Sequence, residues 1–381
     1  MSAPSHEQEA FVHALRRVEL HVHIEGAMTP DLLFTIAKRN GYQMEHDLFD
    51  WSTTAEHGAE TTATYKEYMD LNHFLNVYTK ATEVLKTHRD FHDLGYEYMR
   101  KAHSNGVMHA EIFVDVQTYV DRGLEADDVV HGLEEGFSRG QEEFGISYLM
   151  LGCALRHLSP DQCVDGMEIL RPYHEQGLIH GMGLCSMERG QPPSKFLPAF
   201  QRAKDIGFER FTAHAGEDGP ASYVSEALDV LGVTRIDHGI NGIKDQEVFE
   251  RLRKEGTMVT LCPLSNIALN VIQHLGELPI RKMLDHDLKV SRRRPWWRVE
   301  HAHAQESSPM QFSINSDDPA LFNSWITDNF IAIHKEHALS KADWIKISHD
   351  SIDGSWADQE RKEEMRRQLE QALSAWEHVE W

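Results

Sequence analysis

The chain has 381 residues, a formal net charge of −23, 41% hydrophobic residues and 26% charged residues. This composition is typical of a globular protein with an ample core, and no apolar run approaches the roughly 18 residues that a membrane-spanning helix needs, so we expect no membrane segment. The negative charge disfavours binding to phosphate backbones, and we therefore expect a small neutral substrate rather than a nucleic acid.

The amino terminus and the cysteines indicate where the protein works. Residues 1–10 are polar and acidic and lack the apolar core of a secretory signal, so we expect a cytoplasmic protein with the nucleus as a second compartment. The four cysteines, Cys153, Cys163, Cys185 and Cys262, show no C-x-x-C spacing. Three of them fall in predicted strands, where a thiol acts as a small apolar group, so neither disulfides nor thiolate metal sites are expected.

The first strong pattern is a strict alternation over residues 17–26. Apolar residues occupy one face of this predicted strand, and the polar face carries His21 and His23. An ordinary surface strand alternates in the same way, but two imidazoles at i and i+2 stand side by side and could share one ion. Thr29 and Pro30 then predict a helix start, with Gly41 as the stop.

Residues 61–100 show a helical pattern. Tyr68, Leu71, Phe74 and Tyr78 fall on one apolar stripe at helical spacing. The histidines of this region are most simply solvated or packed side chains, and we assign no chemistry to them.

Strand-like runs then recur, with helical patterns between them. They cover residues 107–114, 147–155, 179–186, 208–216, 234–240 and 257–263. An eighth strand comes from either residues 288–291 or residues 311–315. This alternation predicts one (β/α)8 TIM-type barrel with additional helices, a single domain over residues 1–381. A doubly wound open sheet is the alternative, but no G-x-G-x-x-G follows the first strand.

Polar residues stand where the predicted strands end, which is where barrel enzymes build their sites. They are His21 and His23 of strand one, His214 of strand five with Glu217 beyond it, His238 of strand six, and Asp317 and Asp318 of strand eight. Each alone has an ordinary alternative: an accidental motif, a hydrogen-bonded core histidine, a turn or a helix N-cap. Together, three imidazoles and a carboxylate form a ligand set that favours zinc, with another divalent transition metal as the alternative.

The motifs H-x-H, T-x-H-A-G-E, D-H-G and N-S-D-D-P, in this order, resemble those of the adenosine deaminase family of zinc hydrolases. The likeness runs from about residue 18 to residue 330. Glu25 stands where nucleoside deaminases place an aspartate that meets the ribose, so the chain is similar to the branch of the family that acts on free adenine. Residues 192–196 show the same likeness.

The resemblance implies a role for each site residue. The ligands of one Zn²⁺ ion per chain would be His21, His23, His214 and Asp317. Glu217 would protonate the purine N1, and His238 would orient and help deprotonate the metal-bound water. Asp318 would bond the imidazole edge of the purine, and the Gly183 backbone would meet N3. The chemistry agrees, because a metal lowers the pKa of water to about 7 and an enclosed carboxylic acid can neutralise the ring nitrogen.

Two features depart from the family pattern. Cys185 occupies a position where many relatives carry aspartate, so the floor of the purine pocket differs. Residues 292–313 form an atypical insertion with an arginine- and tryptophan-rich composition foreign to the acidic chain around it. We interpret this stretch as a retained intron or gene-model artefact because the composition changes abruptly. In a chain that contains it, residues 311–315 would supply strand eight, with the insertion looped to the opposite face.

The leading functional hypothesis is zinc-dependent hydrolysis of adenine to hypoxanthine and ammonia in purine salvage. Adenosine is the alternative substrate, and an inactive relative is the alternative if the insertion disrupts the site. A two-metal hydrolase would need a lysine closing strand four, and none follows before Lys195. Deaminases of polynucleotide bases use H-x-E with P-C-x-x-C, which the chain lacks. We expect a small purine base as the partner, without nucleic acid or membrane; the sequence does not reveal the oligomeric state.

Overall fold

The computed structural model describes residues 5–43, 49–54, 60–65, 71–284 and 309–379. Its main sheet has eight parallel strands in the order β1-β4-β5-β6-β7-β8-β9-β10. Their bounds are β1 Arg17–His23, β4 Val107–Val114, β5 Ser147–Leu155, β6 Ile179–Cys185, β7 Phe211–Ala215, β8 Arg235–His238, β9 Met258–Leu261 and β10 Phe312–Ile314. Each strand lies beside the next strand of the predicted order, which confirms a (β/α)8 TIM-type barrel.

The barrel closes between β1 and the residues around the end of β10. Asp317 N donates to His21 O at 3.2 Å, and His23 N donates to Asp317 O at 2.8 Å, which forms a parallel bridge. Leu20 N donates to the side-chain oxygen Oδ1 of Asn315 at 2.8 Å. A side chain thus replaces one backbone acceptor at this seam, and the seam joins the beginning of the barrel to its last strand.

Strand eight comes from the second of the two candidate segments. β10 pairs in parallel with β9, with Phe312 opposite Val259 and Ile314 opposite Leu261. The other candidate, residues 288–291, lies outside the described residues, as does most of the predicted insertion at residues 292–313. Strand β10 begins at Phe312, inside that stretch, so residues 312 and 313 of the predicted insertion belong to the barrel.

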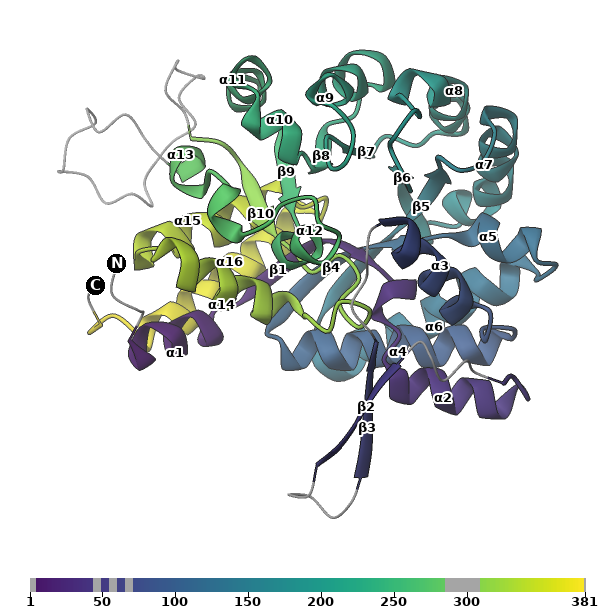
Figure 1. Ribbon diagram of the computed structural model, residues 1–381, viewed down its shortest axis with the longest axis horizontal. Helices are drawn as coiled ribbons and strands as arrows, with labels where there is room; N and C mark the ends of the chain where they lie inside the picture. The colour runs from purple at the N-terminus through teal and green to yellow at the C-terminus, as the bar shows by residue number, and fades with distance from the viewer. Residues whose placement is uncertain (1–4, 44–48, 55–59, 66–70, 285–308, 380–381) are drawn as a thin grey trace.

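Helices follow the strands and surround the barrel (Figure 1). Their bounds are α1 His6–Ala14, α2 Pro30–Arg39, α3 Leu71–Thr82, α4 His88–Ser104, α5 Val116–Asp121, α6 Ala126–Phe144, α7 Pro160–Glu175, α8 Leu197–Ile206, α9 Ala221–Glu226, α10 Ile240–Lys244, α11 Gln246–Glu255, α12 Pro263–Ala268, α13 Ile280–Leu284, α14 Ile326–His337, α15 Lys341–Gly354 and α16 Gln359–Ser374. Short 3-10 turns at Glu25–Ala27, Pro193–Phe196 and Leu275–Glu277 and a π turn at Ala227–Leu231 complete the described elements.

The helix predicted after the first strand is α2, and it begins as its sequence indicates. The Thr29 side chain accepts a hydrogen bond from Leu32 N, and Pro30 takes the first helical position. The helix ends at Arg39, and Gly41 follows with a φ of 64°. This left-handed conformation suits glycine after a helix end.

The region predicted to be helical over residues 61–100 is only partly so. Glu60–Tyr65 forms strand β3, which pairs antiparallel with β2 Phe49–Thr54, and helix begins at α3. The hairpin projects away from the barrel (Figure 1). The prediction was wrong here because the threonines and the tyrosine of β3 favour an extended backbone more strongly than the apolar spacing favours a helix. Tyr68, one of the predicted stripe residues, lies outside the described residues.

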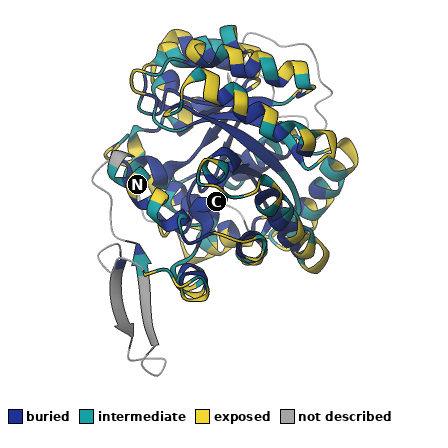
Figure 2. Cartoon of the chain, turned by 90° about the vertical axis from the view of Figure 1, so that its right-hand side faces the viewer, coloured by how far each residue is buried: buried dark blue, intermediate teal, exposed yellow. Residues whose placement is uncertain are grey.

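The barrel strands lie in the most buried part of the molecule (Figure 2). β1 and β4 are buried along their whole length, as expected when both faces of a parallel sheet are covered. A small apolar cluster lies apart from the main core and consists of Phe113, Leu151, Cys153, Leu155 and Cys185. Phe113 stacks on His23 with ring centroids 4.9 Å apart, so this cluster borders the predicted metal ligands.

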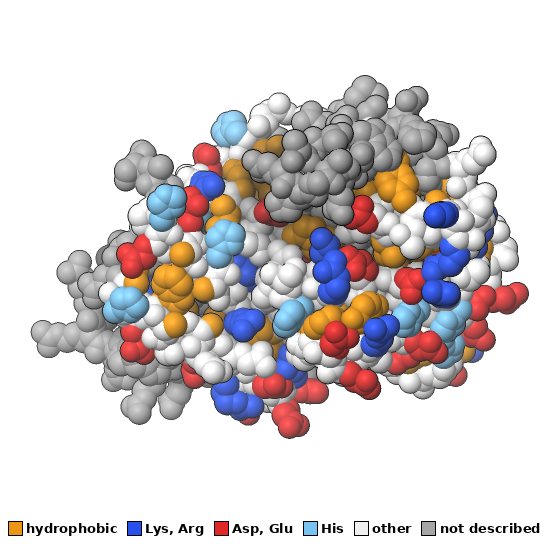
Figure 3. Space-filling model, turned by 90° about the horizontal axis from the view of Figure 1, so that it is seen from below, with side chains coloured by type: hydrophobic (Ala, Val, Ile, Leu, Met, Phe, Trp, Pro, Cys, Tyr) orange, Lys and Arg blue, Asp and Glu red, His pale blue; other side chains and the backbone are white. Residues whose placement is uncertain are grey.

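The surface mixes both signs of charge. Across the described part of the face in Figure 3, lysine and arginine side chains are interspersed with acidic ones. Within the described chain, no helix combines the length and the apolar character needed to cross a membrane.

Candidate metal centre and active site

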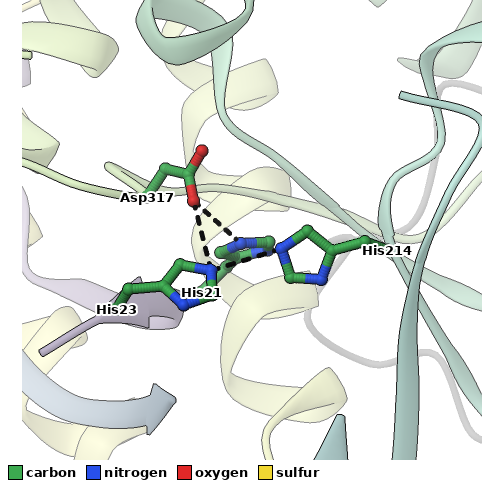
Figure 4. A group of neighbouring side chains, drawn as sticks. All are labelled: His21, His23, His214 and Asp317. Atoms are coloured by element: carbon green, nitrogen blue, oxygen red, sulfur yellow. Dashed lines mark hydrogen bonds and ion pairs between the residues drawn. The ribbon is translucent and has the colours of Figure 1, made fainter. Parts of the chain in front are cut away.

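The four predicted metal ligands meet at the C-terminal ends of three strands. His21 and His23 lie on β1, His214 lies on β7, and Asp317 follows β10. Their ligand atoms lie within 4.8 Å of one another, and all four residues are buried. Figure 4 shows the three imidazoles and the carboxylate pointing toward one another. The fold therefore brings together residues from both ends and the middle of the sequence, which we call the metal-ligand cluster.

The spacing of these ligand atoms fits a single metal ion. Asp317 Oδ1 lies 3.1 Å from His21 Nε2 and 3.5 Å from His23 Nε2. His23 Nε2 lies 3.2 Å from His214 Nε2. Ligand atoms about 2.1 Å from one tetrahedral zinc ion would lie about 3.4 Å apart. His21 Nε2 is buried and forms no hydrogen bond within the described chain, as expected of a ring nitrogen that serves as a metal ligand.

Asp237 of β8 holds two of these imidazoles from behind. Its carboxylate lies 3.6 Å from His21 Nδ1 and 3.6 Å from His214 Nδ1. The same carboxylate accepts hydrogen bonds from Thr212 Oγ1 at 2.7 Å and from Thr260 Oγ1 at 2.9 Å. A carboxylate behind a ligating imidazole fixes the orientation of the ring and raises its basicity. Asp237 therefore lies behind the predicted ligands, where it would orient two of their rings.

Burial and neighbouring charges favour the metal-binding forms of two ligands. Burial disfavours the charged form of Asp317, but the imidazoles of His238 and His21 outweigh it and hold the pKa of the carboxyl well below its usual value. Burial, followed by the charge of His21, keeps the pKa of His214 well below its usual value. A divalent ion requires an ionised carboxylate and neutral imidazoles, so both shifts favour metal binding.

The Asp317 side chain is also fixed by a serine and by an unusual backbone. Ser265 Oγ donates to Asp317 Oδ2 at 2.6 Å. Asp317 has a φ of 70° and His238 has a φ of 61°, a left-handed region that costs a non-glycine residue on the order of 1–2 kcal/mol. Such strain concentrates at functional sites, and here it occurs at the ends of two barrel strands.

Glu217, the predicted proton donor, follows β7 in a tightly held loop. The Glu188 carboxylate accepts hydrogen bonds from Gly216 N and Glu217 N, both at 2.8 Å. Burial, and then the negative charges of Asp317 and Glu188, raise the pKa of Glu217 well above its usual value. The sequence argument relied on enclosure alone to keep the acid protonated, whereas in the structure acidic neighbours add to the effect of burial.

His238 lies beside both the metal-ligand cluster and the acid. His238 Nε2 is 3.8 Å from Asp317 Oδ2, and His238 Nδ1 is 3.6 Å from Glu217 Oε1. The Asn266 side-chain nitrogen lies 3.2 Å from His238 Nδ1 and 3.4 Å from Glu217 Oε1. Burial lowers the pKa of His238 to about 4, so this imidazole is neutral near pH 7 and can accept a proton. Asn266 therefore links the predicted base to the predicted proton donor.

The two predicted substrate-binding residues border the same site. Gly183 lies in β6, and a Cβ there would come within 2.6 Å of Phe113 Cε1, the ring that stacks on His23. Asp318 is buried, and its Oδ1 has no hydrogen-bond partner among the described residues. A Cβ at position 26 would lie 1.9 Å from Asp318 Oδ1, so the close approach of this carboxylate requires Gly26.

Two cysteines that are distant in sequence are neighbours at the site. Cys185 Sγ lies 3.3 Å from Cys153 Sγ, and together with His23 they place their ligand atoms within 4.8 Å of one another. The sequence did not predict this group. Burial raises the pKa of both thiols, which favours their neutral form.

The comparison with known proteins agrees with this geometry. The profile of the family described as adenosine deaminase matches residues 16–292 and 305–372. The chain belongs to this family. The gap between the two matched parts falls inside the predicted insertion. The adenosine deaminase family is metal-dependent, and the metal-ligand cluster is a group of side chains that could hold the ion.

Relatives in this family match the chain over nearly its whole length. The adenine deaminase of Saccharomyces cerevisiae is 37% identical over 370 residues, which cover 97% of this chain and 99% of the relative. The adenine deaminase of Aspergillus fumigatus is 38% identical over 375 residues, which cover 97% and 96%. The crystal structure of an adenine deaminase from Arthrobacter aurescens is similar with a TM-score of 0.79 at 34% identity, covering 94% of this chain and 99% of that one.

Several residues of this deaminase site were not assigned from the sequence. Asp237 is part of the D-H-G motif, and its place near the end of a barrel strand was a usable signal. Ser265 and Asn266 follow strand seven, where barrel sites form, and the structure places both against site residues. Arg156, fully buried, donates from Nη2 to His214 O at 2.6 Å. Its place directly after the predicted strand 147–155 was a usable signal, but its contact with His214 depends on how the ends of two strands meet.

Proposed function

We propose that the protein hydrolyses adenine to hypoxanthine and ammonia with one zinc ion per chain, as a step of purine salvage in the cytoplasm. The convergence of three imidazoles and one carboxylate, with a neutral base and a protonated acid beside them, carries this proposal. The adenine deaminases that match the chain over nearly its whole length support the choice of substrate.

The residues at the site divide the reaction among them. The metal-ligand cluster would hold the ion, which lowers the pKa of water so that a hydroxide nucleophile exists at neutral pH. His238 is held neutral and would take the proton that the attacking water loses. Glu217 is held protonated and would donate to the purine N1, where negative charge arrives when C6 is attacked. The Asn266 side chain contacts both residues and would hold them in position relative to each other.

The position of Glu25 supports the free base over its nucleoside. Glu25 Oε1 accepts hydrogen bonds from Asp115 N at 3.0 Å and from Tyr119 OH at 3.2 Å. One oxygen of this carboxyl is thus held by the protein, in a place where the family's nucleoside deaminases meet a ribose with a shorter aspartate. Adenosine remains the second candidate substrate.

The structure argues against both alternative functions, an inactive relative and a two-metal hydrolase. An inactive relative would follow if the insertion displaced strand eight, but β10 pairs with β9 and Asp317 lies in the metal-ligand cluster. A two-metal hydrolase would need a bridging lysine after β6. Lys195 Nζ instead donates to Gln191 Oε1 at 2.5 Å on the exposed surface.

The test uses the purified full-length chain. Deamination of adenine and adenosine is followed spectrophotometrically, together with the metal content before and after chelation and after adding zinc back. We expect about one metal ion per chain, conversion of adenine that chelation abolishes and zinc restores, and slower reaction of adenosine. Faster reaction of adenosine would overturn the choice of substrate, and a metal-free protein without deaminase activity would overturn the proposal as a whole.

A further inference from the structure

Three carboxyl groups outside the metal-ligand cluster meet at the mouth of the barrel. Glu25 follows β1, Asp115 follows β4 and Asp318 lies beyond β10. Tyr78 of α3 donates a hydrogen bond to Asp115, and Tyr119 of α5 donates one to Glu25. Burial, followed by the charges of the neighbouring acids, raises the pKa of each phenol well above its usual value. We call the three acids the carboxylate cluster, and all three are more than nine-tenths buried.

Each member of the carboxylate cluster has one buried carboxyl oxygen without a hydrogen-bond partner among the described residues. Tyr78 OH donates to Asp115 Oδ2 at 3.0 Å, and Glu25 Oε1 receives hydrogen bonds from Asp115 N and from Tyr119 OH. The other oxygens, Glu25 Oε2, Asp115 Oδ1 and Asp318 Oδ1, are buried and have no hydrogen-bond partner in the described part of the chain. An unsatisfied buried polar atom costs on the order of 1–3 kcal/mol, so three such atoms at the ends of adjacent strands indicate a ligand that supplies a donor.

Asp115 is the member of the cluster that points to a particular donor. It lies near the metal-ligand cluster, because β4 ends directly before Asp115 and pairs with β1 so that Phe113 lies opposite His23 and stacks on its ring. It is separated in sequence from every metal ligand. Its Oδ2 is held by Tyr78, which leaves Oδ1 in a fixed orientation as an acceptor.

The inference rests on the proposed function, in which C6 of adenine lies at the metal and N1 lies at Glu217. Adenine then has one hydrogen-bond donor besides its departing amino group, the N–H of its imidazole ring. We propose that Asp115 Oδ1 accepts this N–H at N9, with Tyr78 as the residue that positions Asp115. In adenosine N9 carries the ribose and has no hydrogen, so the nucleoside would bury the carboxylate without a donor.

This contact explains selectivity for the free base by the general behaviour of polar sites. A site built to hydrogen-bond one group rejects an analogue without it by about 10⁴-fold or more, because the buried partner is left unpaired. Asp115 is therefore a specificity-determining residue, whereas Glu25 supports it through the hydrogen bond from the Asp115 backbone.

The test pairs substitutions at Asp115 with a change in the substrate. The kcat and KM of the zinc-loaded full chain are measured for adenine and for 9-methyladenine, which lacks the N9 hydrogen. We expect Asp115→Leu, which removes the acceptor, to lower kcat/KM for adenine by about 100-fold, consistent with a charge-assisted hydrogen bond. Asp115→Asn keeps an acceptor oxygen and should lose about 10-fold. With 9-methyladenine neither variant should lose activity, and Asp115→Leu should gain at least about tenfold over the wild type, because it removes the carboxylate that this analogue leaves buried without a donor.

Two further variants separate a specific role from a general one. Tyr78→Phe should lower kcat/KM for adenine by about fivefold through KM, without a loss for 9-methyladenine. Asp121→Asn, an exposed aspartate at the end of the same helix α5, should change neither substrate. Metal content and thermal unfolding of each variant confirm that it is folded.

The outcomes distinguish this inference from the proposed function. An equal fall for adenine and 9-methyladenine in Asp115→Leu and Asp115→Asn would overturn the assignment of Asp115 while leaving the deaminase activity intact. If the wild type converts no adenine, the proposed function fails, and the inference fails with it.

Discussion

The metal-ligand cluster and the carboxylate cluster are neighbours, but the pKa of an aspartate shifts in opposite directions in the two clusters. Asp317 faces imidazoles, and these outweigh burial and hold its pKa well below the usual value. Asp318, the next residue, faces other acids: burial and then the charge of Asp317 raise its pKa well above the usual value. The difference shows that partners supplied by distant segments decide whether a buried carboxyl in this barrel is charged.

The largest effect should come from removing the charged carboxylate. Asp317→Ala deletes one of four ligands and leaves three imidazoles, so we expect loss of most of the bound metal and activity below about 1% of the wild type. Metal analysis and the adenine assay measure both. The exposed Asp205→Ala is the matched control and should change neither. Retention of stoichiometric metal by Asp317→Ala would break the comparison, since Asp317 would then not be a ligand.

The next effect should come from the protonated acid. Glu217→Gln keeps the shape of the side chain but cannot donate a proton, so kcat should fall by about 10²–10⁴-fold. The metal content should stay near that of the wild type, because Glu217 is not a ligand, and KM should change by less than about fivefold. A variant that loses its metal instead would show that Glu217 belongs with the charged carboxylates.

A buried ion pair away from the site tests the same effect of a neighbouring charge on a carboxyl group, here through the stability of the folded protein. Burial opposes ionisation of Glu111, but Arg235, whose Nη1 lies 2.6 Å away, outweighs it and lowers the pKa to about 2. A carboxyl with a folded-state pKa below its unfolded value stabilises the protein above pH of about 4.5, and this contribution is lost as the pH falls toward about 2.

The variant Glu111→Gln should therefore lose about 3 kcal/mol of unfolding free energy at pH 7. The difference from the wild type should shrink as the pH falls below about 4.5. Denaturant unfolding at a series of pH values measures it. A difference that is independent of pH would mean that packing, rather than the charge of Glu111, accounts for the loss.

The smallest effect should come from the carboxylate behind the imidazoles. Asp237→Asn keeps the hydrogen-bonding shape but removes the charge 3.6 Å from His21 Nδ1 and His214 Nδ1. Zinc affinity should fall by about 10–100-fold, and excess zinc should restore most of the activity. Competition with a chelator measures the affinity. If excess zinc fails to restore activity, Asp237 has a role beyond orienting the ligands.

Much of the barrel was predictable because its signals are local. Buried parallel strands read as short apolar runs, and a polar residue at the end of each run marks the catalytic face. His21, His23, His214 and Asp317 follow this rule, and the structure brings them together as predicted. The roles of these residues as ligands remain predictions that the substitutions above would test.

The sequence was less informative where several local patterns competed. Residues 61–65 lie in a predicted helix but form a strand, because pairing with β2 favours the extended backbone of a threonine-rich segment. Either of two segments could have supplied strand eight, and the pairing of β10 with β9 decides it. Asn266 follows strand seven, where barrel sites form, but its link between His238 and Glu217 depends on contacts across the barrel that no local pattern indicates.

The sequence by itself determined the order of the first seven barrel strands, the residue types available at each strand end and the family to which the chain belongs. Only the tertiary structure decided which carboxyl groups face imidazoles and which face one another. The physical reason is that apolar periodicity and motif spacing act within a few residues along the chain. The charge of a buried acid instead depends on groups that arrive within a few ångströms from other strands, and no local pattern records their approach.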